Sequence, residues 1–327
     1  MTAIPNDGSG PGGIVCVGAS AGGVDALREF VGGFDASFAG SVLVVLHLPP
    51  SAGSALDRIL ARASRMQAAR GDDGQVLRRG VMYVARPDHH LLVHDGHVRL
   101  SHGPRENGVR PAIDPLFRSA AEAFGDRAVG VVLSGTGDDG TAGLAFLRAR
   151  GGMVLVQDPE DAAYREMPAR AIEAVDVDVV GTPADLATAA AKRIATFGSP
   201  SHVPTRSQEG GDRGVPSEFV CPDCGGTLFE RPDGGVDRFV CRVGHAYSPE
   251  SLLEHQDEHI ENVLWSAVRA FEERADLARR MMDRLDRAGL DHAADRYRIR
   301  IEESRRHGAQ LREYLTRPRE EQEVAAE

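Results

Sequence analysis

Two kinds of hydrophobic pattern alternate along residues 14–195. Short runs that are almost wholly apolar predict buried strands, whereas segments with apolar residues at every third or fourth position predict helices. Predicted strands cover 14–19, 42–47, 129–134, 153–157 and 177–180, and predicted helices lie near 23–31, 54–64, 115–124, 140–150, 166–174 and 184–196. Strands separated by helices predict an α/β fold with a doubly wound, mostly parallel sheet.

One stretch departs from this alternation. The segment GVMYVARPDHHLLVHDGHVRL, residues 80–100, contains three short strand-like runs, with Asp95 and Gly96 as a hairpin turn. We therefore expect an antiparallel hairpin that decorates one edge of the sheet.

The rest of the chain divides by composition. We expect a disordered lead over 1–13, a linker rich in Gly, Pro and Ser over 196–218, a small module with three cysteines over 219–248, a helical hairpin over 249–317 and a flexible tail over 318–327. Ser248 and Pro249 are typical of a helix start, and Gly289 interrupts the helical pattern. The hairpin either packs within the chain or forms an arm for self-association or partner binding.

Charge and hydropathy exclude several classes of function. The net charge of −11 argues against a broad surface for nucleic acid or for anionic membranes. No apolar run approaches the roughly 20 residues of a membrane-spanning helix, so membrane insertion is not expected. The first residues lack the basic start and apolar core of a signal peptide, which favours a cytoplasmic protein.

Three predicted strands end in residues that together can carry out acyl transfer. Ser20 lies in a G-x-S-x-G turn between a strand and a helix, His47 ends an apolar strand, and Asp139 lies in a glycine-rich loop. Taken singly, each residue has a simpler interpretation. The Ser20 loop fits a phosphate-binding loop or a plain turn, His47 fits a strand cap, and Asp139 fits a turn residue or a helix cap. Sites in open α/β sheets form outside the carboxyl ends of the strands, so the three loops can converge into a Ser-His-Asp triad.

Four ordered motifs resemble the catalytic domain of the bacterial chemotaxis methylesterases, the CheB family. They are GASAGG, VVLHLP, RPAIDPLFRSA and SGTGDDGTAG, and the resemblance covers roughly residues 14–195. It implies that Ser20, His47 and Asp139 form the triad. It further implies hydrolysis of glutamate γ-methyl esters on methylated chemoreceptors or related signalling proteins, with glutamine deamidation as a second activity and no cofactor for catalysis.

Further site residues follow from the same motifs. The backbone amides of Ala21 and Thr136 are candidates for an oxyanion hole. Arg110 is a candidate for orienting the substrate, with Asp114 holding its loop; structural ion pairs are the alternative for both.

The chain departs from the family pattern in two ways. Many relatives have threonine at the position of Ala21 and methionine at that of Thr136. Typical members also begin with a phosphoacceptor receiver domain, but only 13 residues precede the first predicted strand here. Control by aspartyl phosphorylation in cis is therefore not expected.

The cysteine module has the spacing of a metal site. Cys221 and Cys224 form a C-x2-C knuckle, and Cys241 and His245 form a C-x3-H knuckle after sixteen intervening residues. This spacing predicts a closed, structural Zn²⁺ site in a zinc-ribbon-like module; a disulfide pair with a spare thiol is the alternative. Cys16, within the first strand, is expected to be a small buried hydrophobe.

Three functions are consistent with these features. A protein-glutamate methylesterase is favoured by the complete triad. The others are a non-catalytic signalling or assembly protein that uses the domain as a docking platform, and an esterase for a small-molecule ester.

Overall fold

The computed structural model describes residues 10–47, 55–197, 214–233, 235–288 and 290–317. The chain divides into two compact units, residues 1–252 and 253–327. Most of the predicted lead, most of the linker, the break at Gly289 and the whole of the tail lie outside the described residues.

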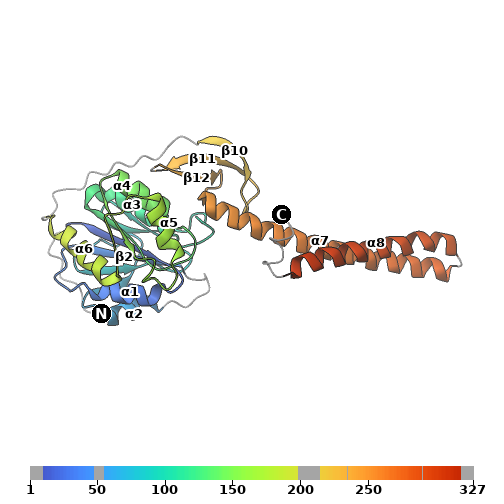
Figure 1. The fold of residues 1–327 in the computed structure, drawn as a ribbon, viewed down its shortest axis with the longest axis horizontal. Coiled ribbons are helices and arrows are strands. Elements are labelled where there is room, and N and C mark those ends of the chain that lie inside the picture. Colours follow the sequence, from blue (N-terminus) through green and yellow to red (C-terminus); the bar gives the residue numbers. More distant parts are fainter. Residues whose placement is uncertain (1–9, 48–54, 198–213, 234, 289, 318–327) are drawn as a thin grey trace. The chain divides into compact units, whose positions relative to one another are not determined.

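A seven-stranded sheet forms the centre of the first unit (Figure 1). Its strands are β1 (Ile14–Ala19), β2 (Ser41–Leu46), β3 (Gln67–Arg70), β4 (Val81–Val84), β7 (Ala128–Val132), β8 (Met153–Gln157) and β9 (Val179–Gly181). They are all parallel and lie in the order β3-β4-β2-β1-β7-β8-β9. The chain moves outward from β1 through β2, then returns to β7 on the other side, so a topological switch point lies beside β1.

Helices cover both faces of this sheet (Figure 1). One face carries α1 (Gly23–Gly32), α2 (Leu56–Ala63) and α6 (Pro183–Ala195), and the other carries α3 (Ile113–Phe124), α4 (Thr141–Ala149) and α5 (Glu166–Ala174). Successive residues of β1 point to opposite faces, so Val15 packs with the first group and Cys16 with the second. Cys16 is fully buried, as predicted, and burial raises the pKa of its thiol well above the ordinary value.

The predicted antiparallel hairpin exists, but its expected place at the edge of the sheet is wrong. Strands β5 (His90–His94) and β6 (His97–Ser101) form a separate two-stranded sheet that packs on α3. The first strand-like run of that segment is instead β4, inside the parallel sheet. Its neighbour β3 was not predicted, because its sequence QAAR is largely exposed and has no apolar run.

The first unit also contains the cysteine module. Strands β10 (Val215–Val220), β11 (Thr227–Asp233), β12 (Val236–Cys241) and β13 (Ala246–Tyr247) form an antiparallel sheet in that order. Strand β10 begins inside the range predicted as linker. Leu228, Phe239 and Tyr247 form a small core with the buried cysteines and Leu252. Strands β11 and β12 lie against α4, so the module packs on the α/β domain.

Two long helices, α7 (Pro249–Arg287) and α8 (Asp291–Thr316), account for the predicted helical hairpin. The first turn of α7 belongs to the first unit, and Ser248 Oγ caps it by accepting a bond from the Ser251 amide at 3.0 Å. Ion pairs join Glu272 to Arg312 and Asp286 to Arg298, which shows that the two helices run antiparallel.

Candidate active site

The three predicted triad residues lie within hydrogen-bonding distance of one another. Ser20 follows β1, His47 follows β2 and Asp139 precedes α4, all at the carboxyl edge of the sheet beside the switch point. The His47 ring places Nδ1 at 3.2 Å from Ser20 Oγ and Nε2 at 2.7 Å from Asp139 Oδ2. The imidazole is 15% exposed and the carboxylate 4%, so solvent reaches this pair only to a small extent.

Asp139 sets the tautomer of the histidine. A carboxylate only accepts hydrogen bonds, so Nε2 of His47 carries a proton and donates to Asp139. Nδ1 is then unprotonated in the neutral ring and accepts the Ser20 hydroxyl proton. The two ring nitrogens thus have the reverse of the roles that they have in the serine-protease triad, while the chemistry is the same.

The Asp139 carboxylate sits at the amino terminus of α3. Its Oδ2 accepts a bond from the Ile113 amide at 2.6 Å, and its Oδ1 accepts one from the Asp114 amide at 3.3 Å. Burial acts to raise the pKa of Asp139. The hydrogen bond from His47, the charge of His47 and the hydrogen bond from the Ile113 amide outweigh burial, so the pKa of Asp139 is lowered. The helix dipole favours the same ionised state.

Asp114, by contrast, is buried at 3% exposure and caps α4. Its Oδ1 accepts bonds from the amides of Gly140 at 3.1 Å and Gly143 at 2.6 Å. Burial, followed by the charge of Asp139, raises the pKa of Asp114 to about 8. The side chain does not face solvent, so the structure places it in support of the site and not in contact with a substrate.

We expect the raised pKa of Asp114 to make the fold less stable as the pH rises from about 4 to 8. The unfolded carboxyl has a pKa near 3.9, so in this window the folded chain binds more protons than the unfolded chain. The free energy of unfolding therefore decreases with pH for this group. Asp139, with its lowered pKa, acts in the opposite direction, at lower pH.

Thermal unfolding of Asp114→Asn against wild type across this range measures the effect. The slope of melting temperature against pH should be less negative in the variant. The absolute stability is not the readout, because an amide cannot replace every bond of the carboxyl group. Parallel slopes for the two proteins would contradict a protonated Asp114.

The nucleophile loop is tied to the loop that follows β7. The Ser20 amide donates to the Ser134 carbonyl at 2.9 Å, and Ser134 Oγ donates to the Ala21 carbonyl at 2.8 Å. Gly135 permits this approach, because a Cβ there would lie 2.9 Å from that of Ser20. Within the described residues, neither the Ala21 amide nor the Thr136 amide donates a hydrogen bond, so both remain available to an oxyanion.

The sequence of the domain that carries this site also matches a known protein family. Residues 15–190 match the family model described as CheB methylesterase, which covers more than half of the chain. The chain belongs to the CheB methylesterase family. The methylesterase function predicted from the sequence motifs is therefore confirmed at the level of the family.

Individual members of the family share this domain. A relative from Leptospira interrogans is 35% identical over 167 residues, which are 51% of this chain and 86% of that protein. The protein-glutamate methylesterase/protein-glutamine glutaminase 2 of Caulobacter vibrioides is 37% identical over 168 residues, and the chain spans about half (48%) of that relative. The crystal structure of the Thermotoga maritima CheB methylesterase catalytic domain aligns with a TM-score of 0.52 at 31% identity, over 57% of this chain and 98% of that one.

Arg110, the candidate for orienting the substrate in this CheB domain, forms hydrogen bonds to residues of two neighbouring loops. Its guanidinium donates to Asp88 Oδ1 from Nε at 2.9 Å and from Nη2 at 2.7 Å, and to the Gly103 carbonyl at 2.6 Å. The side chain is only 13% exposed. The structure therefore favours the structural ion pair that was the alternative for this residue.

One residue of the site was not predicted. Asn107 Nδ2 donates to Asp139 Oδ1 and to Asp114 Oδ2, both at 3.0 Å. The backbone of Asn107 has a φ of 49°, a conformation that asparagine tolerates better than most residues. The available sequence signal was the Asn-Gly pair just before the RPAID motif, but it reads as an ordinary turn.

The four predicted metal ligands of the CheB chain's module also come together. One ligand atom from each of Cys221, Cys224, Cys241 and His245 lies within 4.8 Å of the others. The sulfur atoms of Cys224 and Cys241 are 3.7 Å apart, and His245 Nδ1 lies 3.6 Å from the sulfurs of Cys221 and Cys241. These separations fit the edges of a tetrahedron with Zn–S bonds of about 2.3 Å.

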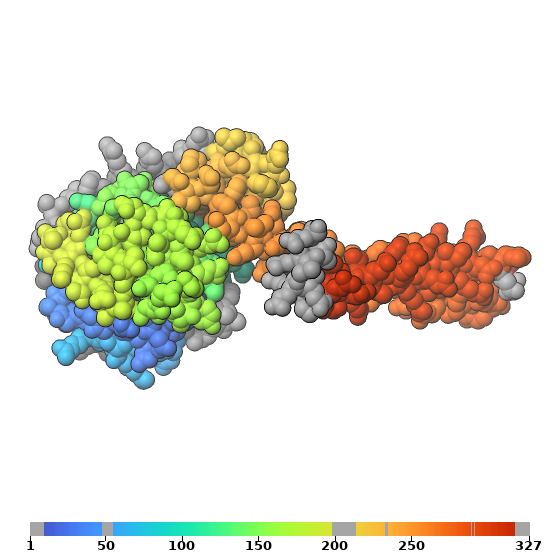
Figure 2. All heavy atoms as spheres, in the orientation of Figure 1, coloured from blue at the N-terminus to red at the C-terminus, as the bar shows by residue number. Residues whose placement is uncertain are grey.

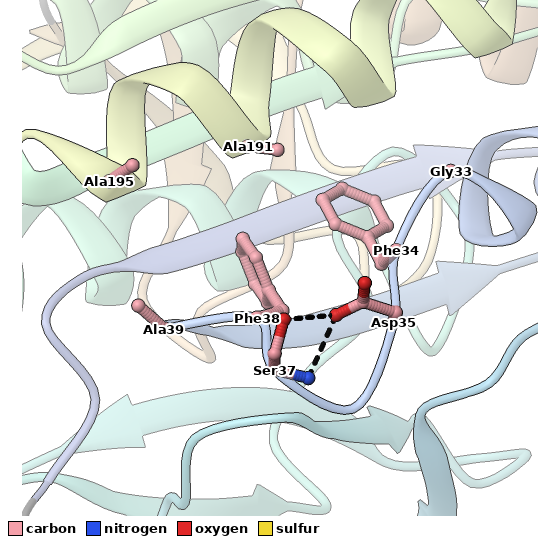
Figure 3. Close-up of a pocket in the computed structure, with 8 residues that line it drawn as sticks. All are labelled: Gly33, Phe34, Asp35, Ser37, Phe38, Ala39, Ala191 and Ala195. Atoms are coloured by element: carbon pink, nitrogen blue, oxygen red, sulfur yellow. Dashed lines mark hydrogen bonds between the residues drawn. The ribbon is translucent and has the colours of Figure 1, made fainter.

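A hollow elsewhere in the methylesterase domain is unrelated to this chemistry. A pocket with a volume of about 260 Å³ lies between the loop after α1 and helix α6. Figure 3 shows Phe34 and Phe38 on one side of it. Ser37 and Asp35 face each other there through hydrogen bonds. The loop leads into the start of β2, so the pocket lies at the amino edge of the sheet, away from the triad.

Proposed function

We propose that the chain is a protein-glutamate methylesterase that acts through Ser20, His47 and Asp139. The observation that carries the proposal is the unbroken path of hydrogen bonds from Ser20 Oγ through the imidazole to Asp139. The name of the Caulobacter relative gives both a methylesterase and a glutaminase activity, so deamidation of glutamine is part of the proposal.

The proposed reaction has two halves. Ser20 Oγ attacks the ester carbonyl carbon while His47 Nδ1 takes the hydroxyl proton, and the imidazolium then protonates the departing methoxide, which leaves as methanol. Water attacks the acyl-enzyme and gives one proton to Nδ1. The imidazolium returns this proton to Ser20 Oγ as the glutamate carboxyl group is released. The amides of Ala21 and Thr136 would donate to the oxyanion in both halves, worth about 3 kcal/mol each in comparable sites.

Incubation with radiolabelled methylated chemoreceptor tests this function directly. We expect wild-type protein to release labelled methanol. A fluorophosphonate probe should label Ser20 and no other residue. Absence of both methanol release and labelling would favour the non-catalytic alternative, while labelling with turnover of only small esters would favour the small-molecule esterase.

We further propose that the Cys221, Cys224, Cys241 and His245 cluster binds one structural Zn²⁺. All four donors belong to the protein, which leaves no open coordination position. Asp223 supports the site, since it accepts a bond from Tyr247 Oη at 2.5 Å and lies 3.9 Å from His245 Nε2. The small core of the module is consistent with a need for metal in folding.

Metal analysis of purified protein should find about one zinc per chain. Cys221→Ser should lose the metal and lower the melting temperature, because three ligands cannot complete the tetrahedron. Cys16→Ala is the matched control: this cysteine is buried in β1, outside the cluster, and its variant should keep the zinc. Metal-free protein from reducing, chelator-free preparations would overturn the assignment.

The proposed partner is a methylated chemoreceptor or a related signalling protein, met in the cytoplasm. Among the described residues, no helix is both long and apolar enough to cross a membrane. Self-association through the C-terminal helices is a further proposal. Its support is that Ile260, Val263 and Leu277 of α7 are more than half exposed.

A further inference from the structure

The cysteine module and the triad meet at one loop, residues 103–109, between β6 and α3. The Asn107 amide donates to the Ala246 carbonyl of β13 at 2.8 Å, and Glu106 forms a parallel bridge with Ala246. The Glu106 carboxylate lies between Arg118 of α3 and Arg238 of β12, at 2.6 Å from each guanidinium. Figure 2 shows the module, in yellow to orange, packed directly on the green atoms of the α/β domain.

The side chain of Asn107 continues this contact into the active site. Its Oδ1 accepts bonds from the Ser248 amide at 3.1 Å and from Ser251 Oγ at 2.9 Å. Its Nδ2 donates to Asp139 and Asp114. The amide thus uses both of its donors and both of its acceptor sites, two toward Ser248 and Ser251 and two toward Asp139 and Asp114.

The module decides which way this amide points. The backbone N–H of Ser248 can only donate, so an NH₂ group facing it would repel it and the oxygen of Asn107 faces it instead; Ser251 Oγ is its second acceptor. Nδ2 is then directed at the carboxylates. Without the module, a rotation by 180° would bring Oδ1 against the ionised carboxylate of Asp139, where two oxygen acceptors repel.

We propose that Asn107 is a positioning residue for the triad. The end of the cysteine module and the first turn of α7, through Ser248 and Ser251, hold it in the orientation that fixes Asp139. The module is then part of the catalytic unit and not an independent appendage. The reaction invoked is the ester hydrolysis proposed above, so this inference rests on that function.

Variants of the full-length chain separate positioning from general structure. Asn107→Gly deletes the side chain but suits the positive φ, and Asn107→Asp keeps the shape but replaces the donor with an acceptor. Ser251→Ala removes the hydroxyl on the module side alone. Ser266→Ala is the matched control, because within the described part of the chain its hydroxyl bonds only to the backbone of the same helix, at Asn262.

We expect kcat to fall roughly 10- to 100-fold in both Asn107 variants, with KM within about twofold, because a bond to a charged group is lost. Ser251→Ala should lower kcat about 3- to 10-fold, and Ser266→Ala should leave it unchanged. In Asn107→Gly, the acid limb of the kcat/KM profile should move to higher pH, because the variant loses one of the hydrogen bonds that lower the pKa of Asp139. The titratable groups around this amide are Asp139, Asp114, His47, His90, Glu106 and Arg118.

A second readout does not depend on turnover. The NMR resonance of the His47 Nε2 proton reports its bond to Asp139, and it should shift in the Asn107 and Ser251 variants but not in Ser266→Ala. An inactive wild-type protein whose resonance shifts as expected would refute the proposed function and leave the positioning intact. Active variants with unchanged kcat, pH profile and resonance would overturn the positioning role. Changes confined to Asn107, with Ser251→Ala indistinguishable from wild type, would overturn the contribution of Ser251 to holding the amide.

Discussion

Ser20→Ala should reduce methanol release from methylated receptor by about 10⁴- to 10⁶-fold. The variant removes the only atom that forms the acyl bond, while the Ser20 amide can still donate to the Ser134 carbonyl and hold the loop. The side chain is small and only half-buried, so the fold should tolerate the change. The measurement is single-turnover release of labelled methanol.

Ser37→Ala is the matched control for this variant. Ser37 is an exposed serine in the loop after α1, at the opposite edge of the sheet, and its loss should leave the rate unchanged. Residual turnover by Ser20→Ala within tenfold of wild type would mean that another group, or water itself, attacks the ester.

The second large effect is expected for Asp139→Asn, with a decrease in kcat on the order of 10³- to 10⁴-fold. Each carboxylate oxygen of Asp139 faces donors: His47 and Ile113 on Oδ2, Asn107 and Asp114 on Oδ1. An asparagine offers one oxygen and one NH₂ group, so the two donors that face the NH₂ group lose their acceptor. If the NH₂ group faces His47, the ring must present Nε2 as an acceptor, and Nδ1 then holds a proton and cannot act as base.

Loss of a helix cap is the confounding effect in this variant, because Asp139 also caps α3. Asp185→Asn is a suitable control, since Asp185 belongs to the capping box of α6 and lies outside the site. Asp185→Asn should lower the free energy of unfolding by a comparable amount, roughly 1 kcal/mol for one helix cap, without loss of activity. Equal kinetic losses in the two variants would assign the effect of Asp139→Asn to the fold and not to the triad.

The parallel α/β fold could be predicted because its strands are buried on both faces. Such strands appear as short apolar runs, and β1, β2, β7, β8 and β9 lie within two residues of their predicted ends. Strand β3 and the place of the β5–β6 hairpin could not be predicted. The former is an edge strand with mixed polarity, and the latter depends on packing against α3, which local sequence does not encode.

The residues of the site likewise separate into those that the sequence could predict and those that it could not. The residue types and the spacings of Ser20, His47, Asp139 and the four module ligands were determined by the sequence alone, since each stands in a motif with its own chemical signature. Asn107 carries no such signature. Its role comes from four hydrogen bonds to residues of α3, the Asp139 loop and the start of α7, and only the folded chain brings these segments together. Tertiary structure likewise decided that Asp114 is a buried cap, because exposure depends on what packs over a residue and not on its neighbours in sequence.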